Sequence, residues 1–216
     1  MERDYFKKGW KSWKKEFWEN KYYILIALVF LAIASFANYY SGVYVTNVNA
    51  QTVPDLILDH IGPYDFSFIF SYGYLLIMVI FFGYPLFFHI GKFHKFLGAF
   101  ALLLIIRSFF IIFTHLQSPL TAIPVHFPGI IQNLSFTNDL FFSGHTAFPF
   151  LGFLLSENKF LKYFFLFSSI IMAVTVLLMH VHYSIDVFAA FLITYASVKL
   201  FEDINKKFKK RLTYKN

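Results

Sequence analysis

The sequence predicts an all-α membrane protein with six transmembrane helices in a bundle and with both termini in the cytoplasm. Of its 216 residues, 58% are hydrophobic and only 14% are charged, whereas a soluble domain has roughly 45–50% apolar and about 25% charged residues. Several apolar stretches also approach the length of about 20 residues that crosses a bilayer as a helix. The Lys and Arg residues alternate along the chain in a way that fits six spans.

The apolar stretches, taken in order, give the boundaries of the spans. They lie at about 22–41, 66–89, 95–115, 139–156, 160–180 and 183–203. The fourth span is short, and a very tight turn joins the last two. Residues 1–21 form a basic segment before this six-span domain (22–203), and residues 204–216 form a basic tail after it.

The N-terminal segment has its own pattern. Aromatic residues recur at helical spacing, namely Phe6, Trp10, Trp13 and Phe17, and lysines occupy mostly the other faces. An amphipathic helix of this kind lies in the headgroup layer of a membrane. The basic start and Ala32-Ile33-Ala34 also resemble a cleaved secretory signal, but the apolar run continues past that site, so we expect an uncleaved span.

The basic residues orient the spans. Connections 42–65 and 116–138 contain no Lys or Arg, whereas the connections after the second and fourth spans carry lysines. Cytoplasmic loops collect Lys and Arg, so six spans place 18 of the 19 basic residues in the cytoplasm, Arg107 being the exception. The net charge of +7 comes mainly from clusters at both ends of the chain, beside apolar segments. The expected partner is therefore the anionic membrane surface, not a nucleic acid.

Polar residues interrupt the apolar spans at three places on the same side. A charged group within a span is costly and usually faces a bundle interior or a wet cavity. The third span runs outward and the fourth and sixth run inward, so the three places meet near the outer interface. The residues concerned are Arg107, Asp139, Ser143, Gly144, His145, His180, His182 and Asp186.

These residue types suit phosphoryl transfer. His182 and Asp186 are four residues apart and would share a helix face, so the carboxylate can accept the Nδ1–H and leave Nε2 as a nucleophile or base. His145 adds a second imidazole for acid–base work, and the planar fork of Arg107 matches phosphate oxygens. The helix starts near Gly144 and His182 present backbone N–H groups to an anion.

Two other interpretations use the same residues. They could be separate capping and packing groups, but that leaves their convergence unexplained. His145, His180 and His182 could bind a metal, but the last two would diverge on a helix and a cation would be repelled by Arg107. We therefore expect no metal. The absence of Cys excludes thiol chemistry and disulfides.

The motifs resemble a known family. Ser143-Gly144-His145-Thr146, followed by His182-Tyr183-Ser184-Ile185-Asp186-Val187, resembles the last two motifs of the sphingomyelin synthases, a branch of the type 2 phosphatidic-acid phosphatase (PAP2) superfamily. Asp139 and His180 also fit that pattern, as does Arg107 with the Thr, Leu and Pro that follow it. Val53-Pro54-Asp55 resembles the Leu-Pro-Asp of the first outer loop.

The sequence also departs from its relatives. Gln117 stands where the synthases have the first Pro of a Leu-Pro-x-Pro motif, and Thr137-Asn138 replace Cys-Gly. Compared with the classical lipid phosphatases, Phe142 replaces the Pro before the Ser, and Val176 stands where a second Arg would be. Because the chain has fewer cationic residues to bind phosphate than the classical phosphatases, it resembles the synthase-like branch more than the phosphatases.

The resemblance implies a mechanism. His182 would attack the phosphorus of a phospholipid headgroup ester and form a phosphohistidine, and Asp186 would orient it. His145 would protonate the departing diacylglycerol oxygen and then deprotonate an acceptor alcohol. Arg107, Ser143 and Gly144 would hold the phosphate, and Asp139 and His180 would support the site or contact the headgroup. The resemblance implies that no cofactor and no metal are needed.

The expected function is therefore transfer of phosphocholine or phosphoethanolamine from a glycerophospholipid to a lipid alcohol, ceramide or diacylglycerol. The alternative is a lipid phosphatase or phospholipase C-like hydrolase of phosphatidate, a phospholipid or a polyprenyl diphosphate, with the same triad. A transporter or scaffold is disfavoured by the intact triad. The site would face the extracytoplasmic side, which is periplasmic in a bacterium and lumenal or exoplasmic in a eukaryote, and the protein could form a homo-oligomer.

Overall fold

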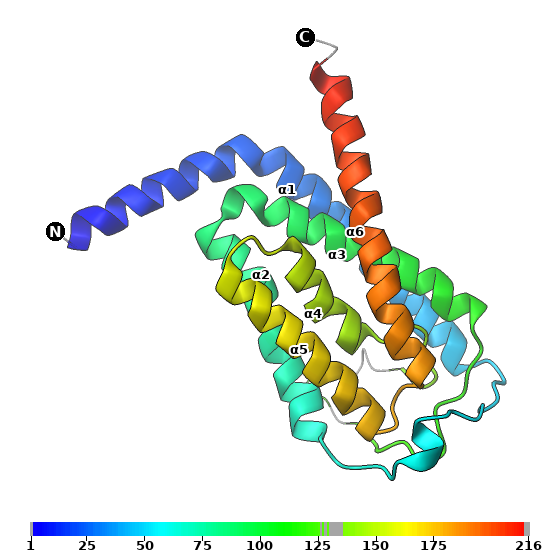
Figure 1. The fold of residues 1–216 in the computed structure, drawn as a ribbon. Helices are drawn as coiled ribbons and strands as arrows, with labels where there is room; N and C mark the ends of the chain where they lie inside the picture. Colours follow the sequence, from blue (N-terminus) through cyan, green and yellow to red (C-terminus); the bar gives the residue numbers. More distant parts are fainter. Residues whose placement is uncertain (1, 126, 128, 130–135, 214–216) are drawn as a thin grey trace.

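The computed structural model describes residues 2–125, 127, 129 and 136–213, and they form an all-α bundle, as predicted (Figure 1). The helices are, in chain order, α1 (Glu2–Thr46), the 3₁₀ turn η1 (Leu58–His60), the π-helical turn η2 (Ile69–Gly73), α2 (Tyr74–Phe88), α3 (Ile90–Phe113), α4 (Gly144–Leu155), α5 (Lys159–Leu178) and α6 (Ser184–Thr213). No strand occurs among the described residues, where one isolated bridge joins Gln51 to Leu116.

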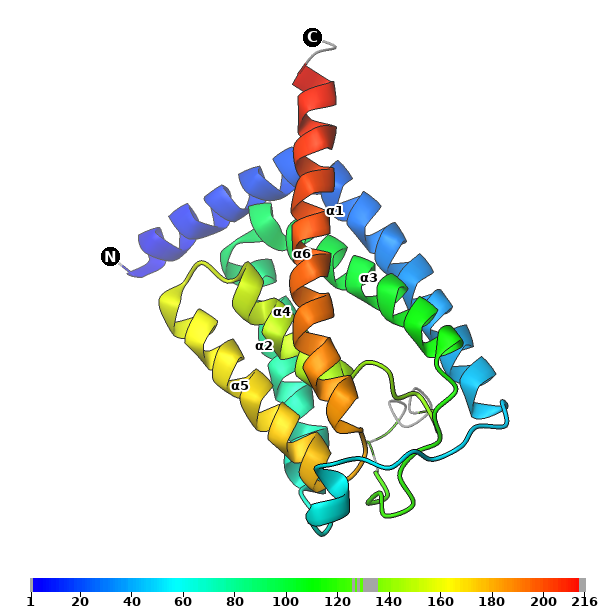
Figure 2. The same ribbon diagram turned by 45° about the vertical axis from the view of Figure 1, so that its right-hand side comes forward.

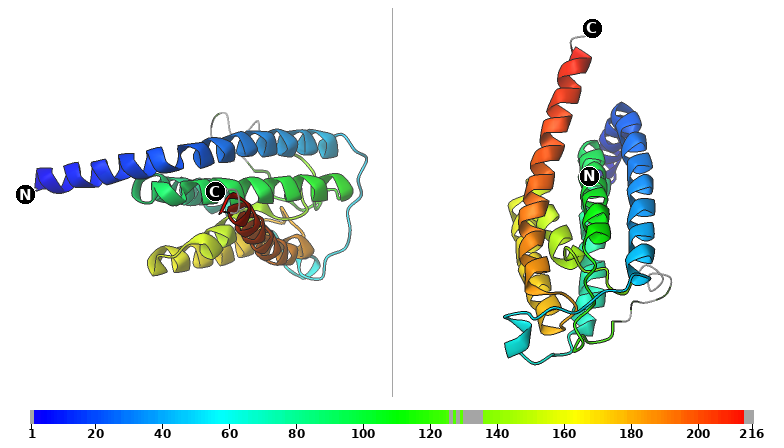
Figure 3. Two further views of the ribbon diagram at one scale, coloured as in Figure 1. Left: turned by 90° about the horizontal axis from the view of Figure 1, so that it is seen from above. Right: turned by 90° about the vertical axis from the view of Figure 1, so that its right-hand side faces the viewer.

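The helices pack so that the two ends of the bundle differ. α1 lies along α3 (Figure 3), and α4 lies between α5 and α6 (Figure 1). One end, which we call the loop end, carries the connections 47–68 and 179–183 and the described residues of 114–143. The other, the terminal end, carries both chain termini and the connections at His89 and at 156–158 (Figure 2).

Five helical stretches are long and apolar enough to cross a membrane. They are Gly9–Thr46, Ile69–Phe88, Ile90–Phe113, Lys159–Leu178 and Ser184–Lys207. They agree with five of the predicted spans, although the first and last helices run well beyond them. The chain is therefore a multi-pass membrane protein.

The fourth predicted span, 139–156, was wrong in its helical extent. Only the 12 residues Gly144–Leu155 are helical, which at 1.5 Å per residue gives about 18 Å, against a hydrocarbon core of about 30 Å. Residues 139–143 approach α4 as irregular chain, whose carbonyl groups at Asp139 and Phe142 accept bonds from Arg107. Such backbone is tolerated at membrane depth where protein groups satisfy it.

The predicted boundary at residue 21 is not a break in structure. Residues 1–21 belong, as far as they are described, to the single 45-residue helix α1, which bends in its first half (Figure 2). Trp13 donates its indole N–H to the Leu86 carbonyl at 2.8 Å, and the Gly91 N–H donates to Glu16. The N-terminal segment therefore rests on the junction of α2 and α3, and its place in a lipid headgroup layer stays a prediction.

Aromatic side chains fill the centre of the bundle. Phe81, Phe100, Phe148 and Phe165 are buried among α2, α3, α4 and α5. Gly152 lets α4 approach α5 closely, because a Cβ there would lie 2.7 Å from the Phe165 ring. Small residues permit such close helix contacts in membranes. The packing fixes the short α4, and with it the polar residues at its start.

Candidate active site

His182 and Asp186 meet at the start of α6, as their spacing predicted. His182 Nδ1 lies 3.3 Å from Asp186 Oδ2, and the carboxylate is fully buried. The same oxygen accepts the Tyr183 N–H at 3.0 Å, which is how an acidic residue in the first turn closes a helix start. His182 itself precedes the helix. Because a carboxylate can only accept, it selects the Nδ1–H form of the imidazole and leaves Nε2 with its lone pair.

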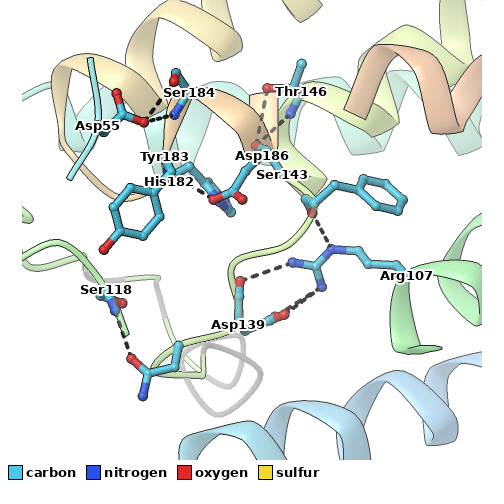
Figure 4. A network of polar contacts seen from close by, with 12 residues as sticks. Asp55, Arg107, Ser118, Asp139, Ser143, Thr146, His182, Tyr183, Ser184 and Asp186 are labelled. Carbon is cyan, nitrogen blue, oxygen red and sulfur yellow. Dashed lines mark hydrogen bonds and ion pairs between the residues drawn. The ribbon is translucent and has the colours of Figure 1, made fainter. Parts of the chain in front are cut away.

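Ser143, which directly precedes Gly144 at the start of α4, joins this helix to the pair (Figure 4). The Ser143 N–H donates to the Asp186 carbonyl at 3.2 Å. The Ser143 hydroxyl caps α4, accepting from the N–H and the hydroxyl of Thr146. A Cβ on Gly144 would lie 3.5 Å from Arg107 Nε. The structure therefore brings both motifs and Arg107 to one place, although the Ser143 oxygen already has a structural partner.

His145 lies among aromatic rings. Its ring stacks on Phe70 with centroids 3.9 Å apart and contacts Tyr74 at 4.2 Å and Phe127 at 6.1 Å. Its Nε2 is buried and has no hydrogen-bond partner among the described residues. Phe70 and Tyr74 could not be singled out from the sequence, because aromatic residues make up 23% of the chain and their pattern carries no signal.

Arg107 is held by the chain segment that leads into α4 (Figure 4). Its Nε donates to the Phe142 carbonyl at 2.9 Å, and Nη2 donates to the Asp139 carbonyl at 3.3 Å. Nη1 contacts the Asp139 carboxylate at 3.0–3.1 Å and Asn38 at 3.4 Å. Arg107 is buried, so Asp139 neutralises its charge. Phosphate binding by Arg107 stays a prediction. A bound phosphate would have to share the guanidinium group with these partners.

His180 follows α5, and its backbone adopts the left-handed conformation, with φ of 55°. Its Nδ1 lies 2.6 Å from the Thr121 hydroxyl, and its Nε2 is buried without a partner in the described part of the chain. His180 and Tyr183 line a cavity of about 630 Å³ between connection 52–63 and residues 119–121. His145, His182 and Asp186 do not line it, so the cavity adjoins the histidine pair without containing it.

Asp55 is a buried carboxylate that the sequence marked only through a motif. Its Oδ2 accepts the Ser184 N–H at 2.7 Å and the Ser184 hydroxyl at 2.8 Å, and its Oδ1 accepts from Ile57 and Leu58. Burial alone would raise the pKa of Asp55, but these hydrogen bonds outweigh it and hold the pKa below its ordinary value. The first connection thereby anchors the start of α6, beside His182.

The described residues contain no cluster of potential metal ligands. Within residues 2–125, 127, 129 and 136–213, no three His, Asp or Glu side chains are arranged to hold one ion.

Residues 137–203 match the family model described as PAP2 superfamily C-terminal. This match supports the PAP2 superfamily. The matched segment is about a third of the chain. It contains α4, α5 and most of α6, and therefore His145, His182 and Asp186. No curated protein and no solved structure matches the chain. A PAP2 segment indicates an enzyme of phosphatase or phosphotransferase type.

Proposed function

We propose that this PAP2-type protein is a lipid phosphotransferase that moves a phosphocholine or phosphoethanolamine headgroup from a glycerophospholipid to ceramide or diacylglycerol. The observation that carries the proposal is the buried His182–Asp186 pair. It is connected through Ser143 to the segment that bears the second imidazole, His145. A nucleophile oriented by a carboxylate, with a second acid–base group, is the arrangement that covalent catalysis requires.

In the first step, His182 Nε2 forms a bond to the headgroup phosphorus while the bond from phosphorus to the glycerol oxygen breaks. His145 gives that oxygen a proton, so diacylglycerol leaves. In the second step, His145 takes the proton of the acceptor hydroxyl, whose oxygen bonds to phosphorus as the N–P bond breaks. Asp186 compensates the positive charge that His182 carries in the intermediate.

The phosphate would lie at the start of α4, near Gly144. Backbone N–H groups at a helix start favour an anion, and Arg107 Nε would lie 3.5 Å from a Cβ at Gly144. The four N–H groups of Arg107 that contact Phe142, Asp139 and Asn38 leave one on Nη2. We propose that Arg107 contributes this group and its charge while it keeps the 139–143 segment in place.

The surroundings of the imidazoles favour transfer over hydrolysis. His182 is 5% exposed, Asp186 is 0% exposed, and the rings of Phe70 and Tyr74 pack against His145. A site that excludes water protects a reactive intermediate until a lipid alcohol arrives. The hydrolase alternative shares the first step, so the acceptor decides between them.

The direct test is an assay of purified protein in detergent with headgroup-labelled phosphatidylcholine and phosphatidylethanolamine, with and without ceramide, beside His182→Ala. A new headgroup-bearing lipid that requires both ceramide and His182 is expected. Release of free phosphocholine or phosphoethanolamine regardless of acceptor would replace the transferase with a hydrolase. If both lipids stay intact, phosphatidate and polyprenyl diphosphates are the next substrates, and their turnover would likewise overturn the transfer reaction.

We also propose that the loop end faces the extracytoplasmic side, because it lacks the lysines that gather at the terminal end. Leu56 is 81% exposed at the loop end, and Lys159 is exposed at the terminal end. The chain has no Cys, so Leu56→Cys and Lys159→Cys each create a single thiol. An impermeant maleimide on intact cells should label Leu56→Cys and leave Lys159→Cys unlabelled until the cells are opened. The opposite pattern would invert the orientation.

A further inference from the structure

The cavity beside the histidine pair is lined by acidic side chains and by few aromatic ones. Its volume of about 630 Å³ is in the range of small-molecule sites. The lining includes Asp55 and Asp59 and the imidazoles of His60 and His180, but no Lys or Arg. Tyr183 is its one aromatic residue apart from these imidazoles, and the Tyr183 hydroxyl donates to the Gln117 carbonyl. The lining therefore attracts a cation.

The polar groups of the lining divide into two sets. Asp55 has both carboxylate oxygens occupied by Ser184, Ile57 and Leu58. Asp59, in contrast, is exposed and uses only Oδ2, which accepts the Asp55 N–H at 3.0 Å.

His60 gives its Nδ1–H to the Leu56 carbonyl at 2.9 Å, so its Nε2 is an acceptor when the ring is neutral. Asp59 and His60 thus offer hydrogen-bond acceptors, which the N–H donors of an ammonium group require.

His180 also lines the cavity and can provide the opposite function, a hydrogen-bond donor; it lies two residues before His182 in the chain. It is 2% exposed and its Nε2 has no partner among the described residues. A buried polar atom without a partner costs free energy unless a ligand satisfies it. When the Thr121 hydroxyl donates to Nδ1, Nε2 carries the hydrogen and can donate to a phosphate oxygen.

We infer that this cavity binds the ammonium end of a phosphoethanolamine headgroup, with the primary ammonium on Asp59 and His60. The phosphate would extend from the cavity toward the start of α4 and place one oxygen on His180. The inference rests on the proposed function and names its donor. A primary ammonium has three N–H donors for these acceptors, whereas the trimethylammonium of choline has none and is bound best by aromatic faces. The donor is therefore phosphatidylethanolamine in preference to phosphatidylcholine.

A graded set of donors tests the inference. Phosphatidylethanolamine and its mono-, di- and trimethylated forms, in mixed micelles with ceramide, remove the N–H donors one at a time. We expect kcat/KM to fall along the series, by about tenfold overall, the value of one charge-assisted hydrogen bond. Asp59→Asn should raise KM for phosphatidylethanolamine by about tenfold and leave kcat within about twofold. It should also remove most of the difference in kcat/KM among the four donors.

Asp65→Asn is the matched control, because Asp65 is an exposed carboxylate of the same connection that bonds to Ser67 and does not line the cavity. It should behave as the unchanged protein. Equal changes in the two variants, or a flat or inverted donor series in the unchanged protein, would overturn the inference.

Binding without chemistry separates this inference from the proposed function. His182→Ala should bind O-phosphoethanolamine more tightly than phosphocholine by calorimetry, and adding Asp59→Asn should remove the difference. If no lipid is turned over but this preference is present, the cavity assignment stands and the transfer reaction fails. If lipids are turned over but the preference is absent, the cavity assignment fails alone.

Discussion

The two ends of the bundle use polar residues in opposite ways. At the loop end, buried polar side chains connect segments far apart in the chain, such as Asp55 with Ser184 and Arg107 with Asp139. At the terminal end, ion pairs are exposed and mostly lie within one helix, such as Lys15 with Glu19 and Lys199 with Glu202. Exposed pairs contribute little to stability, whereas buried polar groups are costly unless they are partnered.

This difference indicates that the two ends have different roles. The terminal end carries most of the positive charge together with Trp10 and Trp18, which are 56% and 62% exposed. Such residues suit a membrane surface. The loop end fixes individual side chains in place, as chemistry on a bound lipid requires. Substitutions at the loop end should therefore have large and specific effects, and substitutions at the terminal end should have small ones.

The largest effect is expected at Asp186. Asp186→Asn keeps an oxygen for the Tyr183 N–H but can no longer act as a carboxylate toward His182 Nδ1. Loss of the right tautomer should lower kcat by about 10³- to 10⁴-fold, nearly as much as His182→Ala. Headgroup transfer measured on both variants checks this, with the thermal unfolding midpoint as a control for folding. Near-normal turnover in Asp186→Asn would remove the triad.

Arg107 should show the largest effect on stability. Arg107→Met leaves the Asp139 carboxylate buried without its partner, because the two side chains are 8% and 14% exposed. Breaking a buried pair in this way typically costs about 3–5 kcal/mol.

The free energy of unfolding in detergent, from denaturant titration, measures this loss. The double variant Arg107→Met with Asp139→Leu should regain much of it, since no unpaired charge remains. If the double variant is as unstable as the sum of the single variants, the pair is not the cause.

A smaller, pH-dependent effect is expected at Asp55. Asp55→Asn weakens the charge-assisted bonds to Ser184 and should lower the free energy of unfolding by about 1–2 kcal/mol at neutral pH. Because folding holds the pKa of Asp55 below its ordinary value, this stabilisation is complete above about pH 4, the unfolded pKa. It disappears as the pH falls through the lower folded pKa.

Unfolding curves of both proteins from pH 7 downward should therefore converge in acid. A difference that stays constant over this range would show that charge is not involved.

The smallest effect is expected at the terminal end, where Lys92 contacts Glu157 and the hydrogen bond from Lys92 lowers the pKa of Glu157. Their side chains are 43% and 74% exposed. Glu157→Gln should change the free energy of unfolding by less than about 1 kcal/mol and leave headgroup transfer unchanged. A loss of transfer like that of Asp186→Asn would contradict the division between the two ends.

Sequence reasoning succeeded where periodicity and topology act alone. Five helices and the convergence of Ser143 with Asp186 followed from apolar runs and from the direction of each span. It failed for the fourth span, because the bonds from Arg107 to the 139–143 backbone replace helical ones and leave no pattern in the sequence.

The partners of His145 and the anchoring of Ser184 by Asp55 were also missed. Phe70 and Tyr74 are two of many aromatic residues, and Asp55 lies 129 positions before Ser184. Local patterns contain no information on contacts at such separation. Only tertiary packing selects the residues that meet.

The most direct test of the central claim is to trap the covalent intermediate. Purified protein is mixed with headgroup-labelled phosphatidylethanolamine without acceptor, stopped in alkali, which preserves phosphohistidine, and digested for mass spectrometry. We predict the mass of a phosphoethanolamine group on the peptide that contains His182, its absence in His182→Ala, and its loss when ceramide is added before the stop. Full turnover with no adduct, or an adduct on His145 instead, would contradict the account.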